Sequence, residues 1–484
     1  MCGRYLGVHE RHVPAPLRVT DFGAEHVSKL NGFPDVQGDL HVGDSIAAAV
    51  ASDFGRYCRQ KPLAVFRPAT ASDVAKVVAF ARARGLPVAA RGQGHSTAGQ
   101  SHAENGIVFD MARLSAMSAV DGDSIWVGAG ARWRDVVHTA LEHRLVPPTL
   151  TDYLDLSVGG TLSMGGIGGE TYRHGAQVDN VLELDVVTAD GELLRCSPAA
   201  HPELFDACRA GLGQFAILCA ARLRLVPAVS HVRTVVAKYA SLAEYLSDFV
   251  RLMDAERFHH LYGNVTPASG GTWDYELVAT RYGGEREPTD GELTQGLSFI
   301  PGQITIRETS YIEFASRVDA YVAMMRETGT WEVPHPWLDV FLRASDAPQV
   351  MGAELAKLTP DSLGRGGVLV YPLRHSRCTA PFLRLPDEEH LFLFDVLRNA
   401  LPPTPENTAE LIDANERAYR RVLTRGGTLY PIGSTPMRSA DWKVHYGTAW
   451  PRVEASKRRY DARQLLTPGH GIFDPRSDSP ATSR

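Results

Sequence analysis

Apolar residues in the first half of the chain occur in short runs that turn residues separate. The runs KPLAVFRP, LPVAARG, GIVFDM and SIWVGAG have the length and composition of β-strands. Between the first two runs lies TASDVAKVVAFARARG (70–85), where apolar residues recur at every third or fourth position, as along one face of a helix. Thr70 or Ser72 can cap this helix, and Gly85 can end it. The pattern predicts a strand, a helix and a second strand that leads into a glycine-rich loop.

The same mixture of short elements continues to about residue 227. VLELDVVTADGELLRC (181–196) predicts two strands joined by the Ala-Asp-Gly turn at 189–191. RWRDVVHTALEHRL and HPELFDACRAGLG have helical spacing, and GDSIAAAVASDFGRYCRQ (43–60) predicts a lead-in helix before the first strand. An α+β domain with many short strands follows from this pattern.

Longer elements follow VPAV (226–229), which marks a boundary. Three segments predict long amphipathic helices: SLAEYLSDFVRLMDAER, FASRVDAYVAMMRETG (314–329) and NTAELIDANERAYRRVLTRGG. Between them, WDYELVATRY, GVLVYPLR and HLFLFDVLR predict strands. The tail then predicts a helix, a Pro-Gly turn and a final strand-like piece, GIF. The second half is therefore a second α+β region.

Composition narrows the class of protein. The chain has 484 residues, 44% hydrophobic and 22% charged, and a net charge of −6, which gives no support for nucleic-acid binding. Six cysteines without CxxC spacing argue against a zinc site or a disulfide framework and fit a reducing compartment. The N-terminus lacks the apolar core of a secretory signal, and no apolar run reaches membrane-spanning length. We expect a cytoplasmic protein with no metal site, no nucleic-acid partner and no membrane contact.

Three glycine-rich segments are candidates for cofactor binding. In ARGQGHSTAGQ (90–100), the glycines permit positive φ and close approach of the main chain, with His95 pointing at a bound group. TDYLDLSVGGTLSMGGIGGE (151–170) exposes many N–H groups that could cradle a pyrophosphate, and LLTPGHGIF (465–473) is a third such piece. The chain has no GxxxxGK[ST] motif and no strand–GxGxxG–helix unit. The alternatives are a turn-rich connection and an ordinary loop histidine.

These segments together produce a resemblance to a known family. With DFGRYCRQKPLAVFRPAT, YRHGAQVDNVLELDVVTADGELLRCS, ELFDACRAGLGQFAIL, HPWLDVF, VLVYPL and YDARQLLTPGHGIF, they resemble the vanillyl-alcohol oxidase and p-cresol methylhydroxylase (PCMH) flavoproteins. Within that superfamily the chain most resembles the cytokinin dehydrogenases, in the family's order from residue 53 to 473. The resemblance implies an α+β, two-domain PCMH-type FAD-binding fold with an α+β substrate (cap) domain. The expected parts are an N-terminal segment with the lead-in helix (1–59), the PCMH-type FAD-binding domain (60–227), the cytokinin dehydrogenase-like cap domain (228–430), a C-terminal segment that returns to the FAD domain (431–473) and a mobile tail (474–484).

The resemblance also implies how FAD is held. In families with the loop pattern G-x-G-H-S, the histidine carries the 8α-methyl of the flavin, so FAD would be covalently linked through His95. Tyr153 stands where some relatives have a second, cysteine link, which implies a single attachment. The cofactor positions implied are Ala90, Gly92, Gly94, His95, Ser96, Gln100, Asp152, Ser157, Ser163, Ile167, Ile217, Tyr430, Thr467 and His470.

The same resemblance makes Asp152 of LTDYL the catalytic candidate, as the base that takes a proton from the substrate. We expect desolvation in a partly dry pocket to raise the pKa of this carboxyl, which suits a general base. The alternative is a turn-capping aspartate. Leu150 replaces the tryptophan usual before this motif.

Tyr262 and Trp337 are the candidate substrate-binding residues. Tyr262 stands where the family has a glutamate that binds the purine ring, and a phenol cannot replace that carboxylate at equal strength. Trp337 of HPWLDVF could pack on the substrate or be a structural tryptophan. These departures should leave flavin binding intact, but they count against cytokinin itself as the substrate.

The leading hypothesis is an FAD-dependent enzyme that oxidises a C–N or C–OH bond of a small molecule by hydride transfer to flavin N5. Its electron acceptor would be oxygen or a quinone-like compound. The alternative within this class is a true cytokinin dehydrogenase, which cleaves the N6 side chain of isopentenyladenine-type cytokinins. Two other classes are a flavin-free scaffold that inherited the fold and an NADPH-dependent reductase. Retention of His95 and Asp152 argues against the scaffold, and the histidine link argues against the reductase.

Overall fold

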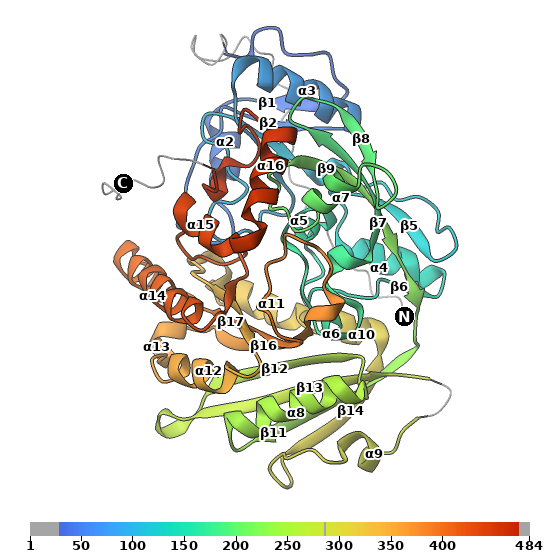
Figure 1. Cartoon of the computed structure of the whole chain (residues 1–484), viewed down its shortest axis with the longest axis vertical. Coiled ribbons are helices and arrows are strands. Elements are labelled where there is room, and N and C mark those ends of the chain that lie inside the picture. Colours follow the sequence, from blue (N-terminus) through green and yellow to red (C-terminus); the bar gives the residue numbers. More distant parts are fainter. Residues whose placement is uncertain (1–28, 285–286, 474–484) are drawn as a thin grey trace, which may run out of the picture.

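The computed structural model describes residues 29–284 and 287–473. Residues 1–28 of the predicted N-terminal segment (1–59) and the whole predicted mobile tail (474–484) lie outside the described residues. Figure 1 shows two small sheets in one half of the molecule and a large sheet in the other.

The first small sheet contains the strand–helix–strand unit that the sequence predicts. Its strands are β1 (Asp39–His41), β2 (Ala64–Arg67), β4 (Ile107–Asp110) and β3 (Val88–Arg91), in that spatial order, with β2, β4 and β3 parallel. Helix α3 (Ala71–Arg84) begins at a capping box between Thr70 and Asp73 and ends at Gly85, whose φ is 64°. The lead-in helix is shorter than predicted: α2 (Asp44–Val50) ends before Phe54, so the second part of the predicted segment is irregular chain.

The second small sheet has the order β5 (Ser124–Gly128), β9 (Ala216–Arg224), β7 (Val181–Thr188) and β8 (Leu193–Cys196), with β7 and β8 forming the predicted hairpin. Four helices accompany it: α4 (Trp133–Glu142), α5 (Val158–Met164), α6 (Thr171–His174) and α7 (Pro202–Cys208). A two-stranded ribbon pairs β6 (Leu145–Val146) with β10 (Val226–Pro227).

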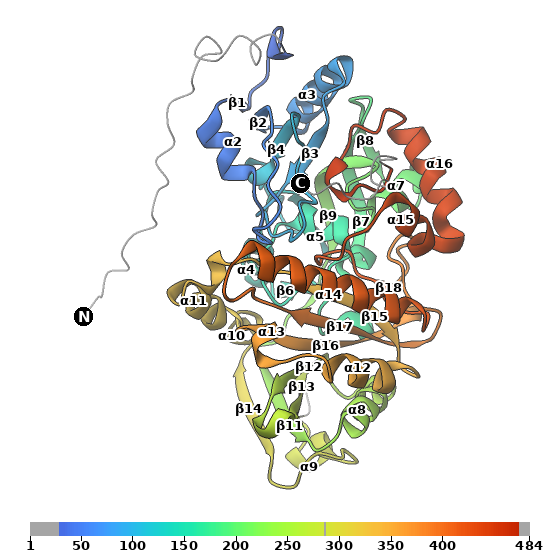
Figure 2. The ribbon, with the colours of Figure 1, turned by 90° about the vertical axis from the view of Figure 1, so that its left-hand side faces the viewer.

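The large sheet has eight antiparallel strands. Their order is β14 (Ile304–Ser310), β11 (His231–Tyr239), β13 (Trp273–Tyr282), β12 (His260–Pro267), β16 (Gly367–Arg374), β17 (His390–Leu397), β15 (Leu338–Arg343) and β18 (Thr428–Leu429). One face packs under helices α8 (Leu242–Ala255), α12 (Ala347–Leu355) and α14 (Pro405–Leu423), which Figure 2 shows beside it. The other face carries Phe341, Tyr371 and Leu393, which join the core of the second small sheet. Alternation along the strands thus gives this sheet two buried faces. The short helices α9 (Asp290–Thr294) and α13 (Pro360–Leu363) lie in its connections.

One helix prediction is wrong. The segment 314–329 is not a single helix. Helix α10 (Tyr311–Ala315) covers only residues 314 and 315 of it, and α11 (Asp319–Glu327) starts after a break at residues 316–318. The break contains Arg317, which turns inward, as described below.

The C-terminal part returns to the first half of the molecule. Helices α15 (Ser439–Tyr446) and α16 (Trp450–Tyr460) lie beside the small sheets in Figure 1, where α16 contacts α7. Beyond them the N–H of Thr467 donates to the carbonyl of Val88 at 2.8 Å, which ties this segment to β3. The final strand-like piece is not a strand, because residues 471–473 form a turn. No helix in the described ranges is long and apolar enough to cross a lipid bilayer.

Candidate active site

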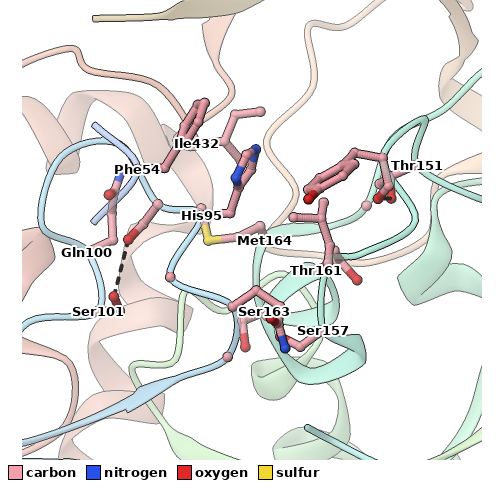
Figure 3. A pocket seen from close by; sticks show the side chains of 18 of the residues that line it. Phe54, His95, Gln100, Ser101, Thr151, Ser157, Thr161, Ser163, Met164 and Ile432 are labelled. Carbon is pink, nitrogen blue, oxygen red and sulfur yellow. Dashed lines mark hydrogen bonds between the residues drawn. The ribbon is translucent and has the colours of Figure 1, made fainter. Parts of the chain in front are cut away.

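A cavity of about 400 Å³ lies where the glycine-rich segments, β9 and the large sheet meet (Figure 3). All the residues that the sequence analysis assigns to the cofactor contribute to its lining, from Ala90 through Asp152 to His470. Trp337 lines it as well, whereas Tyr262 does not. The fold therefore brings together segments that lie up to 416 positions apart in the sequence, from Phe54 to His470.

His95 lies inside this cavity in an aromatic stack. Its ring centroid is 4.1 Å from that of Phe54 at an interplanar angle of 26°, and Phe54 stacks in turn on His335 at 3.9 Å and 8°. Desolvation, and to a smaller extent the neighbouring His335, lowers the pKa of His95 to about 3. The imidazole is therefore neutral at physiological pH and keeps a free lone pair.

Two glycines explain the conformation of the loop that carries His95. A Cβ at Gly92 would lie 1.8 Å from the Oγ of Ser157, so the loop can approach helix α5 only with glycine there. Gly94 has a φ of 68°, and a Cβ there would lie 2.2 Å from Nη2 of Arg91. These glycines set the loop, and hence the imidazole, against the cavity.

Hydrogen bonds within the loop and to Asp53 hold the loop in place. The Ser96 hydroxyl donates to Oδ2 of Asp53 at 3.0 Å, and the N–H of Gly99 donates to the same oxygen at 2.6 Å. Ser96 also lies 3.2 Å from the Oγ of Ser101 (Figure 3). Gln100 accepts from the N–H of Ala98 at 2.7 Å. In this structure Ser96 and Gln100 therefore order the loop, and Asp53, which the sequence analysis did not single out, anchors it.

The lining suits FAD. Its side chains are mainly apolar, as flat rings require, and the hydroxyls of Ser157, Ser163 and Thr467 lie beside glycine main chain that can approach phosphate groups closely. The hydroxyl of Tyr430 accepts from the N–H of Gly166 at 3.2 Å, and His470 is buried with its pKa lowered to about 3 by desolvation. Neutral groups of this kind hold a cofactor through hydrogen bonds rather than charge.

Asp152 is the charged centre of the cavity wall. Its Oδ1 accepts a bond from Nη2 of Arg317, and its Oδ2 accepts from the Tyr371 hydroxyl at 2.8 Å. His260 lies behind, with Nε2 3.8 Å from Asp152 Oδ1 and 2.9 Å from the guanidinium. The Asp152 side chain is 16% exposed.

The expected pKa shift of Asp152 is wrong in direction. Desolvation does raise it, as the sequence analysis expects, but the charge of Arg317 and the bonds from His260 and Tyr371 outweigh burial. The pKa of this carboxyl therefore lies well below its usual value, and the group is ionised at any physiological pH. The sequence gives little sign of the partner, because Arg317 belongs to a segment that has helical spacing throughout.

Tyr262 on β12 stands one layer behind the cavity. The guanidinium carbon of Arg317 lies 5.3 Å from its ring centroid, and its ring stacks at 6.2 Å on Tyr371. It supports the partners of Asp152 in this structure, and direct substrate contact by Tyr262 stays a prediction.

Two further aspartates were missed by sequence reasoning. Asp339 on β15 and Asp395 on β17 face each other across paired strands, and both line the cavity. A signal was available for Asp395, since it interrupts the otherwise apolar strand HLFLFDVLR.

Comparison with known protein families places this cavity in a flavoenzyme. Residues 62–197 match the model described as "FAD binding domain", and residues 287–473 match "Cytokinin dehydrogenase 1, FAD and cytokinin binding". A solved structure, 6-hydroxy-D-nicotine oxidase from Arthrobacter nicotinovorans, superimposes with a TM-score of 0.70 at 24% identity over 92% of this chain and 99% of that one. It shows the same overall fold. The protein thus has an FAD-binding domain and the overall fold of a two-domain PCMH-type flavoenzyme.

Full-length relatives define the family more closely. An uncharacterised oxidoreductase of the fasciation locus of Rhodococcoides fascians is 36% identical over 91% of this chain and 100% of its own length. Cytokinin dehydrogenase 5 of Oryza sativa subsp. japonica is 35% identical over 96% of this chain and 95% of its own. This chain belongs to the cytokinin dehydrogenase family of FAD-dependent oxidoreductases.

Proposed function

We propose that this enzyme oxidises a C–N or C–OH bond of a small organic molecule, with FAD covalently bound to His95 and Asp152 as the base. The observation that carries the proposal is the placement of a neutral imidazole and an ionised carboxylate on the wall of one cavity. When bound there, FAD supplies the acceptor for the hydride that leaves the substrate.

His95 provides the attachment because its unprotonated nitrogen can bond to carbon, and Phe54 fixes the plane of the ring. Tyr153 lies 5.4 Å from His95 between ring centroids, and a phenol there offers no thiol for a second link. The single attachment of FAD follows from these two residues.

Asp152 orients the substrate by accepting a hydrogen bond from its N–H or O–H group. Arg317 and Tyr371 hold the carboxylate in place, each on a different oxygen. Because its pKa is lowered, Asp152 takes the proton only as hydride departure makes the N–H or O–H group strongly acidic. Trp331, Trp337 and Phe54 form an apolar part of the same cavity wall, around His95.

The second candidate function is oxidation of a true cytokinin, with cleavage of the N6 side chain of an isopentenyladenine-type compound. The favouring observation is the match to proteins named cytokinin dehydrogenase over nearly their whole length. Against it stands Tyr262, which replaces the glutamate expected from the family and lies outside the cavity lining.

The test is anaerobic reduction of the purified holoenzyme, followed by the loss of flavin absorbance, with isopentenyladenine, a set of amines and a set of secondary alcohols. We expect an amine or secondary alcohol to bleach the flavin faster than isopentenyladenine does. The opposite order would favour the second candidate. Reoxidation by air compared with a quinone then identifies the acceptor.

Asp152→Asn, measured with the fastest compound, should slow bleaching by a factor of about 10² to 10⁴ while FAD content stays constant. An unchanged rate would remove Asp152 from the mechanism.

A further inference from the structure

A buried pair of carboxyl groups occupies the part of the cavity wall formed by the large sheet. Asp339 and Asp395 are directly opposite each other on β15 and β17 and are 0% and 6% exposed. Both line the cavity. Gly433 leaves room for them, since a Cβ there would lie 2.2 Å from Oδ2 of Asp339.

These carboxyls lack the partners that a buried charge normally has. Both oxygens of Asp339 and Oδ1 of Asp395 have no hydrogen-bond partner elsewhere in the described part of the chain. No lysine, arginine or histidine of the described residues contributes to the electrostatics of either group. Asp152 differs, because Arg317 and Tyr371 satisfy it. Apart from the hydrogen bond between the two carboxyls, the pair has no partner that satisfies its oxygens. Such a pair is costly to bury, so its position on a cavity wall indicates a ligand that completes it.

The charge state of the pair defines that ligand. Desolvation raises the pKa of Asp339 to about 7, and desolvation together with the charge of Asp339 raises the pKa of Asp395 well above its usual value. The pair therefore keeps at least one proton near neutral pH, and together the two groups carry at most about one negative charge. A cation that enters the site displaces the shared proton and meets two facing acceptors.

We propose that the Asp339–Asp395 pair binds a cationic nitrogen group of the substrate, such as an amidinium or a protonated amine. This inference rests on the proposed function, because that function places the substrate in this cavity. It narrows the substrate to a molecule that carries a basic nitrogen in addition to the bond that is oxidised. Charge-assisted bonds to two carboxyls fix the position of such a group, while Asp152 serves the reacting end.

Benzamidine and benzamide provide the test, because they share a shape, differ in charge and carry no hydride for a flavin to accept. Binding to the holoenzyme at pH 8 is followed by isothermal calorimetry and by the visible spectrum of the flavin. We expect benzamidine to bind roughly tenfold to a hundredfold more tightly than benzamide. Equal affinities would overturn the proposal.

The double variant Asp339→Asn/Asp395→Asn should lose this preference, with both compounds binding about equally. Its FAD content and thermal unfolding midpoint report whether it is folded, and single Asp→Asn variants replace it if it is not. A preference that persists in a folded variant overturns the proposal. If the variant changes the flavin spectrum but still prefers benzamidine, the pair interacts with the cofactor instead, and the proposal is overturned.

The affinity for benzamidine should also increase between pH 6 and pH 8, while that for benzamide stays constant. The titratable groups that act on the pair are Asp152, Tyr371 and Tyr430. The pKa of Asp152 lies well below this range and those of the two tyrosines well above it, so only the pair changes its charge. A flat dependence for benzamidine contradicts the proposal.

These measurements use compounds that are not oxidised, so they are independent of catalysis. Asp152→Asn should retain the preference for benzamidine. If that variant leaves turnover unchanged while the preference depends on Asp339 and Asp395, the proposed base is wrong and the cation site stands. If turnover depends on Asp152 but the preference is absent, the cation site is wrong.

Discussion

The reactivity expected of His95 comes from its surroundings. An exposed imidazole is partly protonated near neutral pH, whereas the ring beside Phe54 and His335 is kept neutral by loss of water contact. The Gly-His-Ser sequence singles out His95 as a candidate, but spacing alone could predict neither Phe54, which stacks on it, nor His335, which stacks on Phe54. Phe54 lies 41 positions before His95, and His335 lies 240 after it.

His95→Ala should release its flavin on acid precipitation, whereas the pellet of the parent enzyme stays yellow. The reason is that removal of the imidazole removes the only proposed bond to FAD. Tyr153→Phe is the matched control and should keep a yellow pellet. Flavin released from the parent enzyme by acid would contradict covalent attachment, and a yellow His95→Ala pellet would indicate another attachment site.

Among the helices and strands, the predicted single helix over 314–329 is wrong, because the structure has a break between α10 and α11. The apolar spacing of 314–329 runs through Ser316, Arg317 and Val318 without a glycine or proline, so local preference favours one helix. A capping box starts α10 at Ser310, and the helix ends at Ser316, which places Arg317 against Asp152. A contact 165 residues away in the sequence decides the geometry here, and no local pattern encodes it.

Arg317→Met should move the acid limb of the kcat/KM profile to higher pH. In the parent, Arg317 holds the pKa of Asp152 low; without it, desolvation dominates and the carboxyl protonates at higher pH. A shift of about one to three pH units is expected, with lower activity on the acid side. Arg326→Met changes an exposed arginine on α11 and should leave the limb in place. An unmoved limb in Arg317→Met would assign the ionisation to another group.

For the whole molecule, the short elements of the first half were predictable because strands and helices differ in period and in their turn residues. The α3 capping box and the β7–β8 hairpin are examples. The order of the large sheet was not, since β16 lies beside β12, about 100 residues earlier, and no local pattern encodes that pairing. The pattern predicted two α+β regions, and the family resemblance implied the PCMH-type arrangement. The domain boundaries assigned from the sequence stay predictions.

Buried neutral histidines make global stability sensitive to acid. Desolvation lowers the pKa of His445 to about 3, far below 6.5, so between these values the unfolded chain binds a proton that the folded chain does not. The contribution of His445 is complete above pH 6.5 and is lost as the pH falls towards 3. In His445→Leu, the loss of unfolding free energy between pH 6.5 and pH 4 should be shallower, by at most about 1.4 kcal/mol per pH unit.

Urea unfolding at several pH values measures this slope. His143→Leu, which changes an exposed histidine at the end of α4, serves as the control and should keep the slope of the parent. Equal slopes for His445→Leu and the parent would show that His445 is already charged in the folded protein.

The residues that line the cavity are synthesised at different times, because they come from distant parts of the chain. Thr467 and His470 are the last of its residues to be synthesised, and the N–H of Thr467 donates to the carbonyl of Val88, close to Ala90 in the sequence. A nascent chain still attached to a ribosome at residue 430 would have the His95 loop and the aspartates but an open compartment. Translation proceeds from the N-terminus. We therefore expect FAD to be retained only after Thr467 and His470 have been synthesised, and a ribosome stalled before codon 467 should yield colourless protein.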